Sequence, residues 1–175
     1  MRILVLAFLL PLLAACSGRP SLDTAYPEPE LVLEAYFDGD LIAHGQFQDL
    51  FGEVRRRFVV EIDGTWDGET LTLVEDFVYE DGSTEQRIWT LMPTGPDTWE
   101  GTAPGVIGTA EGRLNGSAFN WEYVIDLPLA DGETMRVGFD DWMWLIDEDV
   151  LLNRAYMYRY GIRIGEVIIT FRKLD

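Results

Sequence analysis

Several charged residues of this chain lie two positions away from apolar residues. Arg56 alternates in step with Phe58 and Val60, and Glu75 alternates in step with Phe77. Side chains two residues apart on a strand point to the same face, so these charges are predicted to share an interior face with the apolar residues. A buried charge is unfavourable unless it is paired. The pattern therefore predicts a polar group inside an otherwise apolar protein.

This interior group has two interpretations. It is either an ion-pair network inside a filled core or the polar end of an apolar cavity, where arginine would bind a carboxylate or phosphate and aromatic residues would line an apolar tail. The candidate residues for the network or the ligand site are Arg56, Glu75, Arg87, Trp89, Trp121, Tyr123, Asp141 and Arg154.

The usual sequence signatures of catalysis are missing. The chain has one histidine, His44, and one cysteine, Cys16, and it contains neither a G-x-S-x-G motif nor a glycine-rich phosphate loop. Asp140 and Asp141 are adjacent, so on a strand they would face opposite sides and could not share an acid–base or cation site. We predict no catalytic residue, metal site or cofactor.

The first residues are typical of a secretion signal rather than of a folded domain. Arg2 precedes an apolar run of about eleven residues, whereas a membrane-spanning helix needs roughly 20. The run ends in Leu13-Ala14-Ala15-Cys16, which is similar to the lipobox at which bacteria attach a lipid to the cysteine thiol. We predict a lipoprotein signal peptide over residues 1–15 and lipidation of Cys16; an ordinary signal peptide that contains a cysteine is the alternative.

The segment after the signal is expected to be a tether. Residues 16–29 hold three prolines and few residues that could pack, and at full extension the segment spans about 40 Å. Ser17 is not acidic and so gives no inner-membrane retention signal. We therefore expect a cell-envelope protein that is lipid-anchored to the outer membrane and faces the periplasm.

The charge of the chain limits its partners. Its net charge is -18, which opposes contact with phosphate backbones and excludes nucleic acid as an expected partner. The same charge opposes flat binding to anionic lipid, so the acyl chains would have to supply the membrane anchor.

Residues 30–175 are predicted to form one β domain. Residues 30–37 favour a short helix, because Pro29 suits a helix start and Asp38-Gly39 a helix end. Beyond it, alternating segments are separated by hairpin dipeptides such as Asp81-Gly82, Asn115-Gly116 and Asp131-Gly132. About ten strands are expected, over residues 42–50, 54–63, 69–80, 84–93, 96–103, 107–114, 117–128, 132–146, 150–160 and 164–173.

Closely spaced, hairpin-linked strands predict an antiparallel sheet. Closure into an up-and-down barrel removes the exposed sheet edges, so an all-β, lipocalin-like barrel is favoured over a two-sheet sandwich.

One hairpin allows a prediction of register. Glu80-Asp81-Gly82 fits a three-residue loop with glycine last, which pairs Tyr79 with Ser83 and then Glu75 with Arg87. This register unites Glu75 and Arg87 with Phe77 and Trp89 on one face. A two-residue loop at Asp81-Gly82 would shift the pairing and separate them.

The chain also resembles a known family. The resemblance rests on Phe51-Gly52 with residues 54–58, on residues 75–82 with Arg87 and Trp89, and on residues 139–143, 152–154 and 161–167. These blocks are similar to the proteobacterial lipoproteins grouped as domain of unknown function 3833. The resemblance implies an outer-membrane-tethered, lipocalin-like β domain, and it supplies no catalytic residues.

Three functions are compatible with the sequence. The favoured one is a tethered barrel that binds a lipid-like or other apolar small molecule. The second is an interaction or structural protein with a solid barrel that docks a membrane-bound partner. The third and least favoured is a lipid-modifying enzyme, because no nucleophile–base pair is evident. The size of an interior cavity separates the first two.

Overall fold

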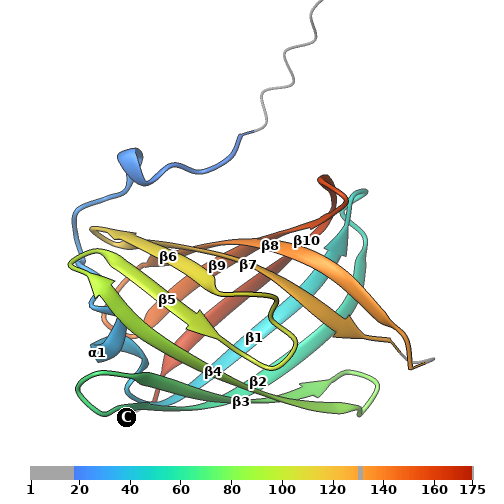
Figure 1. Ribbon diagram of the computed structural model, residues 1–175, viewed down its shortest axis with the longest axis horizontal. Helices are drawn as coiled ribbons and strands as arrows, with labels where there is room; N and C mark the ends of the chain where they lie inside the picture. Colours follow the sequence, from blue (N-terminus) through green and yellow to red (C-terminus); the bar gives the residue numbers. More distant parts are fainter. Residues whose placement is uncertain (1–17, 130–131, 175) are drawn as a thin grey trace, which may run out of the picture.

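Ten antiparallel strands form a closed barrel in the computed structural model, which describes residues 18–129 and 132–174 (Figure 1). Each strand pairs with its neighbours in the chain, and β1 closes the barrel against β10. The up-and-down barrel is therefore confirmed, and the sandwich alternative is wrong. The strands are β1 (Gly39–Asp49), β2 (Val54–Trp66), β3 (Leu71–Tyr79), β4 (Thr84–Gly95), β5 (Thr98–Thr102), β6 (Ala110–Asn115), β7 (Ala118–Pro128), β8 (Thr134–Leu145), β9 (Val150–Arg159) and β10 (Ile162–Lys173).

The hairpin between β3 and β4 has the predicted register. Glu75 pairs with Arg87, and the backbone N–H of Tyr79 donates to the carbonyl of Ser83 at 2.9 Å. Gly82 closes the turn with a φ of +81°, a conformation that residues with a Cβ adopt only at a cost. The three-residue loop is confirmed, and it places Glu75 and Arg87 on the inner face of the barrel.

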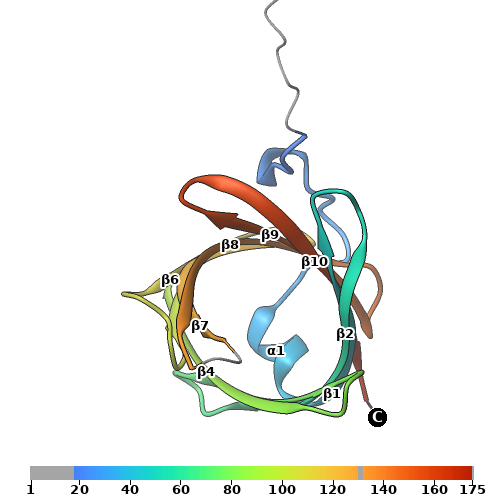
Figure 2. The same ribbon diagram turned by 90° about the vertical axis from the view of Figure 1, so that its right-hand side faces the viewer.

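A short helix closes one end of the barrel. The expected N-terminal helix is present as α1 (Leu33–Phe37), and Figure 2 shows it inside the ring of strands. Leu33 and Phe37 are buried in the core, and the Phe37 ring meets Phe171 edge to face at 5.9 Å. Lys173 donates to the carbonyls of Ala35 and Tyr36, so a cation lies at the C-terminal end of the helix, where it interacts favourably with the helix dipole.

A glycine in β2 makes room for this helix. A Cβ at Gly64 would lie 1.7 Å from the carbonyl oxygen of Phe37, which no side chain could tolerate without a backbone shift. Trp66, two residues further along β2, also contacts the end of the helix, because its backbone N–H donates to the Asp38 carboxylate at 2.9 Å. The floor of the barrel therefore depends on a close backbone contact between α1 and β2.

The described part of the predicted flexible tether, residues 18–29, lies against the barrel wall. A 3-10 turn, η1 (Leu22–Thr24), contacts β6 and β7, and the Asn115 side chain donates to the carbonyl of Leu22 at 2.7 Å. Ser117 donates its N–H to Tyr26 at 2.8 Å, and Arg19 forms ion pairs with Glu122 and Asp140. These contacts hold the segment from Arg19 onward. Cys16 and the expected signal peptide lie outside the described residues.

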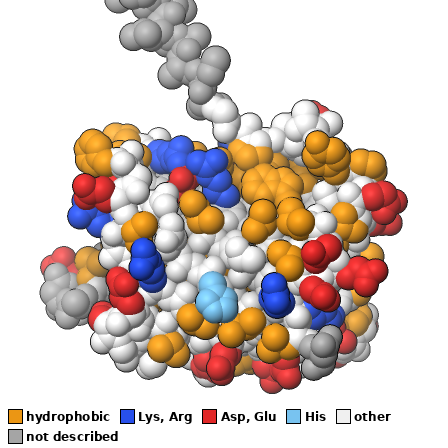
Figure 3. Space-filling view, turned by 180° about the vertical axis from the view of Figure 1, so that it is seen from behind, with side chains coloured by type: hydrophobic (Ala, Val, Ile, Leu, Met, Phe, Trp, Pro, Cys, Tyr) orange, Lys and Arg blue, Asp and Glu red, His pale blue; other side chains and the backbone are white. Residues whose placement is uncertain are grey.

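The outer surface mixes charged and apolar side chains. Figure 3 shows the face that carries the single histidine, His44 on β1, which is exposed. Across the described parts of the chain, no helix has both the length and the apolar character needed to cross a bilayer.

Candidate functional site: a cavity inside the barrel

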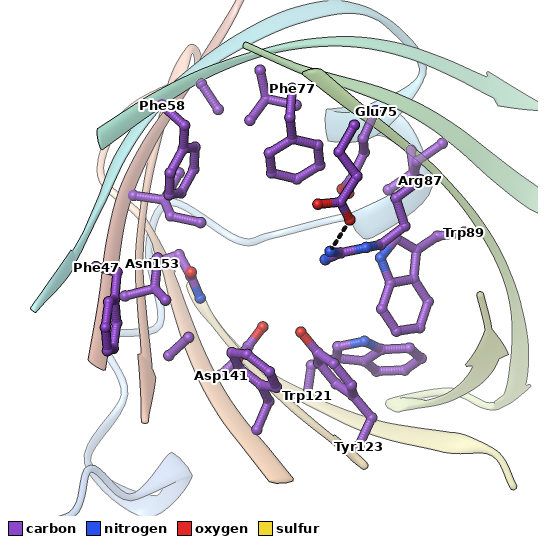
Figure 4. Close-up of a pocket in the computed structure, with 18 of the residues that line it drawn as sticks. Phe47, Phe58, Glu75, Phe77, Arg87, Trp89, Trp121, Tyr123, Asp141 and Asn153 are labelled. Carbon is purple, nitrogen blue, oxygen red and sulfur yellow. Dashed lines mark hydrogen bonds and ion pairs between the residues drawn. The ribbon is translucent and has the colours of Figure 1, made fainter. Parts of the chain in front are cut away.

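The barrel encloses a cavity of about 400 Å³ between α1 and the opposite end of the strands. This volume lies within the range of about 300–1,000 Å³ that is typical of small-molecule pockets. Leu33 and Phe37 of the helix form part of its lining, and aromatic residues from several strands form much of the wall (Figure 4). The interior is therefore hollow rather than filled.

Seven of the eight candidate residues line this cavity. They come from five strands, β2, β3, β4, β7 and β8, which barrel closure arranges around one interior: Arg56, Glu75, Arg87, Trp89, Trp121, Tyr123 and Asp141. Around them the wall is apolar, with Phe47, Phe58, Phe77, Phe139 and Met135 among the lining residues.

Arg87 on β4 is the cation within the polar part of the cavity. It is mostly buried, and its Nη2 lies 2.7 Å from Oε1 of Glu85. Glu75 faces it across the ladder, and the guanidinium lies over the Phe77 ring at 5.2 Å from the ring centroid. Burial opposes the charged guanidinium, but Tyr123, Glu75 and Glu85 nearby raise the pKa of Arg87 above its usual value. Arg87 therefore stays charged.

Glu75 is held in a different state. Burial inside the barrel raises the pKa of Glu75 from 4.5 to about 7, against the opposing effect of Arg87, while Glu85 raises it further. Near neutral pH, Glu75 consequently exchanges a proton, and it donates or accepts a hydrogen bond depending on the pH.

Asp141 on β8 is the most isolated carboxylate of the cavity. It is 7% exposed, and its Oδ1 accepts no hydrogen bond from any residue that the structure describes. Burial raises the pKa of Asp141 well above its usual value, and Asp140 and Glu75 raise it further while Arg87 lowers it. Tyr123 points into the same space as Asp141 (Figure 4), and burial likewise raises the pKa of its phenol.

Asp140, the neighbour of Asp141, faces outward as expected for adjacent strand residues. Its carboxylate lies 2.8 Å from Nε of Arg19 and accepts a hydrogen bond from Asn120 at 2.9 Å. The two aspartates therefore belong to different faces of β8 and do not form one site.

A second polar group lies near the open end of the barrel. Arg56 on β2 lies over the Tyr79 ring at 3.4 Å from its centroid and donates to the Ser83 hydroxyl at 2.8 Å. The Tyr79 hydroxyl donates to Glu85 at 2.8 Å, and burial, followed by this bond, raises the pKa of Tyr79 to about 12. The Arg56 side chain is 45% exposed, so it is a residue of the rim rather than of the interior.

Arg154 does not belong to the cavity, and its predicted interior position is wrong. It faces outward from β9, where its Nε lies 2.7 Å from Glu166 and its guanidinium lies over Tyr156. The inward face of β9 instead carries Asn153, Ala155 and Met157. The outer face of this strand also carries an aromatic residue, Tyr156, which packs beneath Arg154 and Arg163. Since both faces of β9 hold apolar residues, the alternation pattern assigned Arg154 to the wrong face.

Two further polar residues of the lining, Asn153 and Glu85, were not predicted from the sequence. Asn153 is buried and donates to the carbonyl of Trp142 at 3.3 Å, and Glu85 links Arg87 to Tyr79. Both could have been found from the strand pairing. Glu85 lies directly opposite Phe77, and Asn153 lies two residues from Ala155, which is directly opposite Asp141. Residues directly opposite in a ladder share a face.

The cavity combines an extensive aromatic wall with a small polar group. Its aromatic wall provides a large apolar contact area, and the polar group provides a few oriented donors and acceptors. Among the residues that the structure describes, no serine, cysteine or histidine lines the cavity.

Comparisons with known proteins agree with this fold. A family described as protein of unknown function (DUF3833) matches residues 10–173. The S-type phycobiliprotein lyase CPES from Guillardia theta has a similar structure, with a TM-score of 0.60 and 9% identity over 81% of this chain and 90% of that chain. A designed fluorescence-activating β-barrel aligns with a TM-score of 0.42 and 12% identity over 81% of this chain and 96% of that chain. A search of curated proteins finds no match.

Proposed function

Because the chain belongs to the DUF3833 family of proteins of unknown function, we propose its role from the barrel itself: it binds a lipid-like or other apolar small molecule inside the cavity. The observation that carries this proposal is the hollow interior of about 400 Å³, lined by aromatic side chains around a buried polar group. The same observation argues against the alternative of a solid barrel that serves only as a docking surface.

The proposal includes the location of the protein. Cys16 carries a lipid after cleavage of residues 1–15, and the barrel is anchored in the cell envelope, at the outer membrane and facing the periplasm. The support for this is the basic start, the short apolar run and the Leu13-Ala14-Ala15-Cys16 sequence. Membrane contact would then bring the barrel close to apolar molecules that dissolve poorly in water.

Mass spectrometry of small molecules that co-purify with the untagged mature protein tests the binding function. The expected result is a lipid-like molecule in a fixed ratio to the protein. A protein that is well folded and consistently free of such molecules, and that also fails to take up added alkyl compounds, would refute the proposal.

A matched pair of variants separates cavity binding from surface binding. Ala155 lies on the cavity wall, whereas Leu152 on the same strand is 40% exposed on the outside. Ala155→Phe should fill part of the cavity and reduce the bound molecule, while Leu152→Phe should leave it unchanged. Equal retention by both variants would place the molecule on the outer surface.

A further inference from the structure

The charged groups of the cavity do not balance. Its lining holds three carboxylates, Glu75, Glu85 and Asp141, and two guanidiniums. One of these, Arg56, lies at the rim, where it bonds Ser83 and faces Asp81 outside the cavity at 3.9 Å. Of the described residues that line the cavity, Arg87 is therefore the one interior cation beside three carboxyl groups.

This imbalance bears on which ligand the cavity can take. An anionic head group placed at Arg87 would also meet Glu75, Glu85 and Asp141, and like charges repel strongly in a poorly solvated interior. Glu85 already occupies the guanidinium at 2.7 Å. The positive charge of Arg87 is therefore already compensated by carboxylates of the protein, and the expected binding of a ligand carboxylate or phosphate to it is disfavoured.

Asp141 supplies an unfilled position. It is more than nine-tenths buried, its Oδ1 has no hydrogen-bond partner within residues 18–129 and 132–174, and its side chain points into the cavity (Figure 4). A buried acceptor without a donor is destabilising. A ligand group that donates a hydrogen bond to it would remove this penalty, and the bond would therefore contribute strongly to the free energy of binding. Oδ1 of Asp141 is therefore the atom at which a hydrogen-bond donor of the ligand is expected to bind.

The surroundings of Asp141 favour a cation as that donor. Trp121 lies directly opposite Asp141 in the ladder, and the neighbouring Tyr123 stacks on Phe139 with ring centroids 5.1 Å apart. Aromatic faces attract ammonium groups, and the attraction grows when water is excluded. The net charge of -18 would also raise the local concentration of cations near the protein.

From these observations we infer that the ligand is an amphiphile whose polar end is a protonated amine, with its ammonium group at Asp141 and its apolar chain along the aromatic wall. The inference rests on the proposed function, since it specifies the ligand of the same cavity. Phe58, Phe77 and Phe139 provide the apolar contact for the chain.

The protonation state of Asp141 gives the inference a second readout. Burial raises the pKa of Asp141 well above its usual value, with added effects of Asp140 and Glu75 and an opposing effect of Arg87, so Asp141 retains its proton to higher pH than an exposed aspartate does. An ammonium group bound there favours the carboxylate. A proton that Asp141 holds before binding then leaves to solvent, so binding of the amine should be accompanied by proton release.

The test compares three compounds with the same alkyl chain, dodecylamine, dodecanol and dodecanoate, each below its micelle concentration. The protein is the chain from Ser17 to Asp175, which contains every described residue. Titration is followed by tryptophan fluorescence, because Trp89 and Trp121 line the cavity. The amine should bind about ten-fold or more tightly than either of the others, as expected for a charge-assisted hydrogen bond.

Two variants locate the selectivity. Asp141→Asn should reduce the affinity for dodecylamine by about ten-fold while changing that for dodecanol little. Asp63→Asn, an exposed strand aspartate, is the matched control and should change neither affinity. Calorimetry in buffers with different ionisation enthalpies should show proton release for the amine and none for the alcohol.

The possible outcomes separate the inference from the proposed function. Stronger binding of dodecanoate, or equal binding of amine and alcohol, would overturn the inference while leaving a ligand-binding barrel. Failure of all three compounds to bind would overturn both. The ranking of the three compounds on the unmodified chain decides the question even if Asp141→Asn fails to fold.

Discussion

At the scale of single residues, Arg87 holds together carboxylates that would otherwise repel one another inside the barrel. Replacing Arg87 with Met leaves Glu75, Glu85 and Asp141 without their common cation, so we expect a loss of about 3–5 kcal/mol in the free energy of unfolding near pH 8. Chemical denaturation measures this. The loss should shrink at acidic pH, where protonation removes the repulsion.

Arg154 is the control for that variant. Its ion pair with Glu166 lies on the outer surface, with the arginine side chain 45% exposed, and pairs of this kind contribute about 1 kcal/mol or less. Arg154→Met should therefore be tolerated at every pH. Equal losses for the Arg87 and Arg154 variants would contradict the central role of Arg87.

Glu75 gives a prediction for the dependence of stability on pH. Its pKa is raised by burial from 4.5 to about 7 in the folded state, so the folded protein binds more protons than the unfolded chain between these pH values. The contribution of Glu75 to stability therefore decreases as pH rises from 4.5 to 7, by up to roughly 3 kcal/mol, and is constant above that window.

Glu75→Gln removes this contribution. The difference in the free energy of unfolding between the variant and the original protein should grow in favour of the variant from pH 4.5 to 7. The difference is the informative quantity, because carboxylates with lowered pKa, such as Asp67 and Asp126, change stability in the opposite direction. A difference that is flat with pH would mean that Glu75 is ionised throughout.

Most of the charged residues that line the cavity could be predicted from the sequence, because a charge two positions away from apolar residues on a strand indicates an inner face. This holds for Glu75, Arg87 and Asp141, which all line the cavity. It failed for Arg154, because an aromatic residue packed beneath a guanidinium makes the outer face of β9 look like an inner one. Whether the interior is hollow depends on how all the inward side chains fill the barrel together, and the alternation of polar and apolar residues along a strand does not predict this.

At the scale of the elements, the turns were more informative than the strand interiors. The Glu80-Asp81-Gly82 loop fixed the register of β3 and β4, and every expected strand is present with ends within three residues of those observed. The packing of residues 18–31 against β6 and β7 was missed. A proline-containing segment with few apolar residues gives no periodic signal, yet it binds here through backbone groups and Arg19.

Helix α1 provides an element-scale prediction. Gly64→Ala would place a methyl group against the carbonyl of Phe37, so the helix must shift, and we expect a loss of about 1–3 kcal/mol in stability. Gly138→Ala is the matched control, because a Cβ there has its nearest contact at 3.9 Å. Thermal denaturation compares the two. If Gly64→Ala were as stable as the control, the close helix contact would not be required.

At the scale of the whole molecule, the proposed anchor depends on one side chain. Cys16→Ala should prevent lipidation, leaving an unprocessed precursor or releasing soluble protein, as judged by cell fractionation and protein size. A mature-size protein that still fractionates with membranes would contradict the lipid anchor.

The contact of Arg19 with Glu122 and Asp140 changes what such an anchor would mean. Arg19 lies three positions after Cys16 in the sequence, and at full extension the chain between them spans about 10 Å. With the proposed lipid in place, the linker between the lipid and the barrel would be short, and the barrel wall at β7 and β8 would stay beside the lipid head groups. A cavity held at that distance experiences the effective concentration of molecules dissolved in the bilayer rather than their much lower concentration in water.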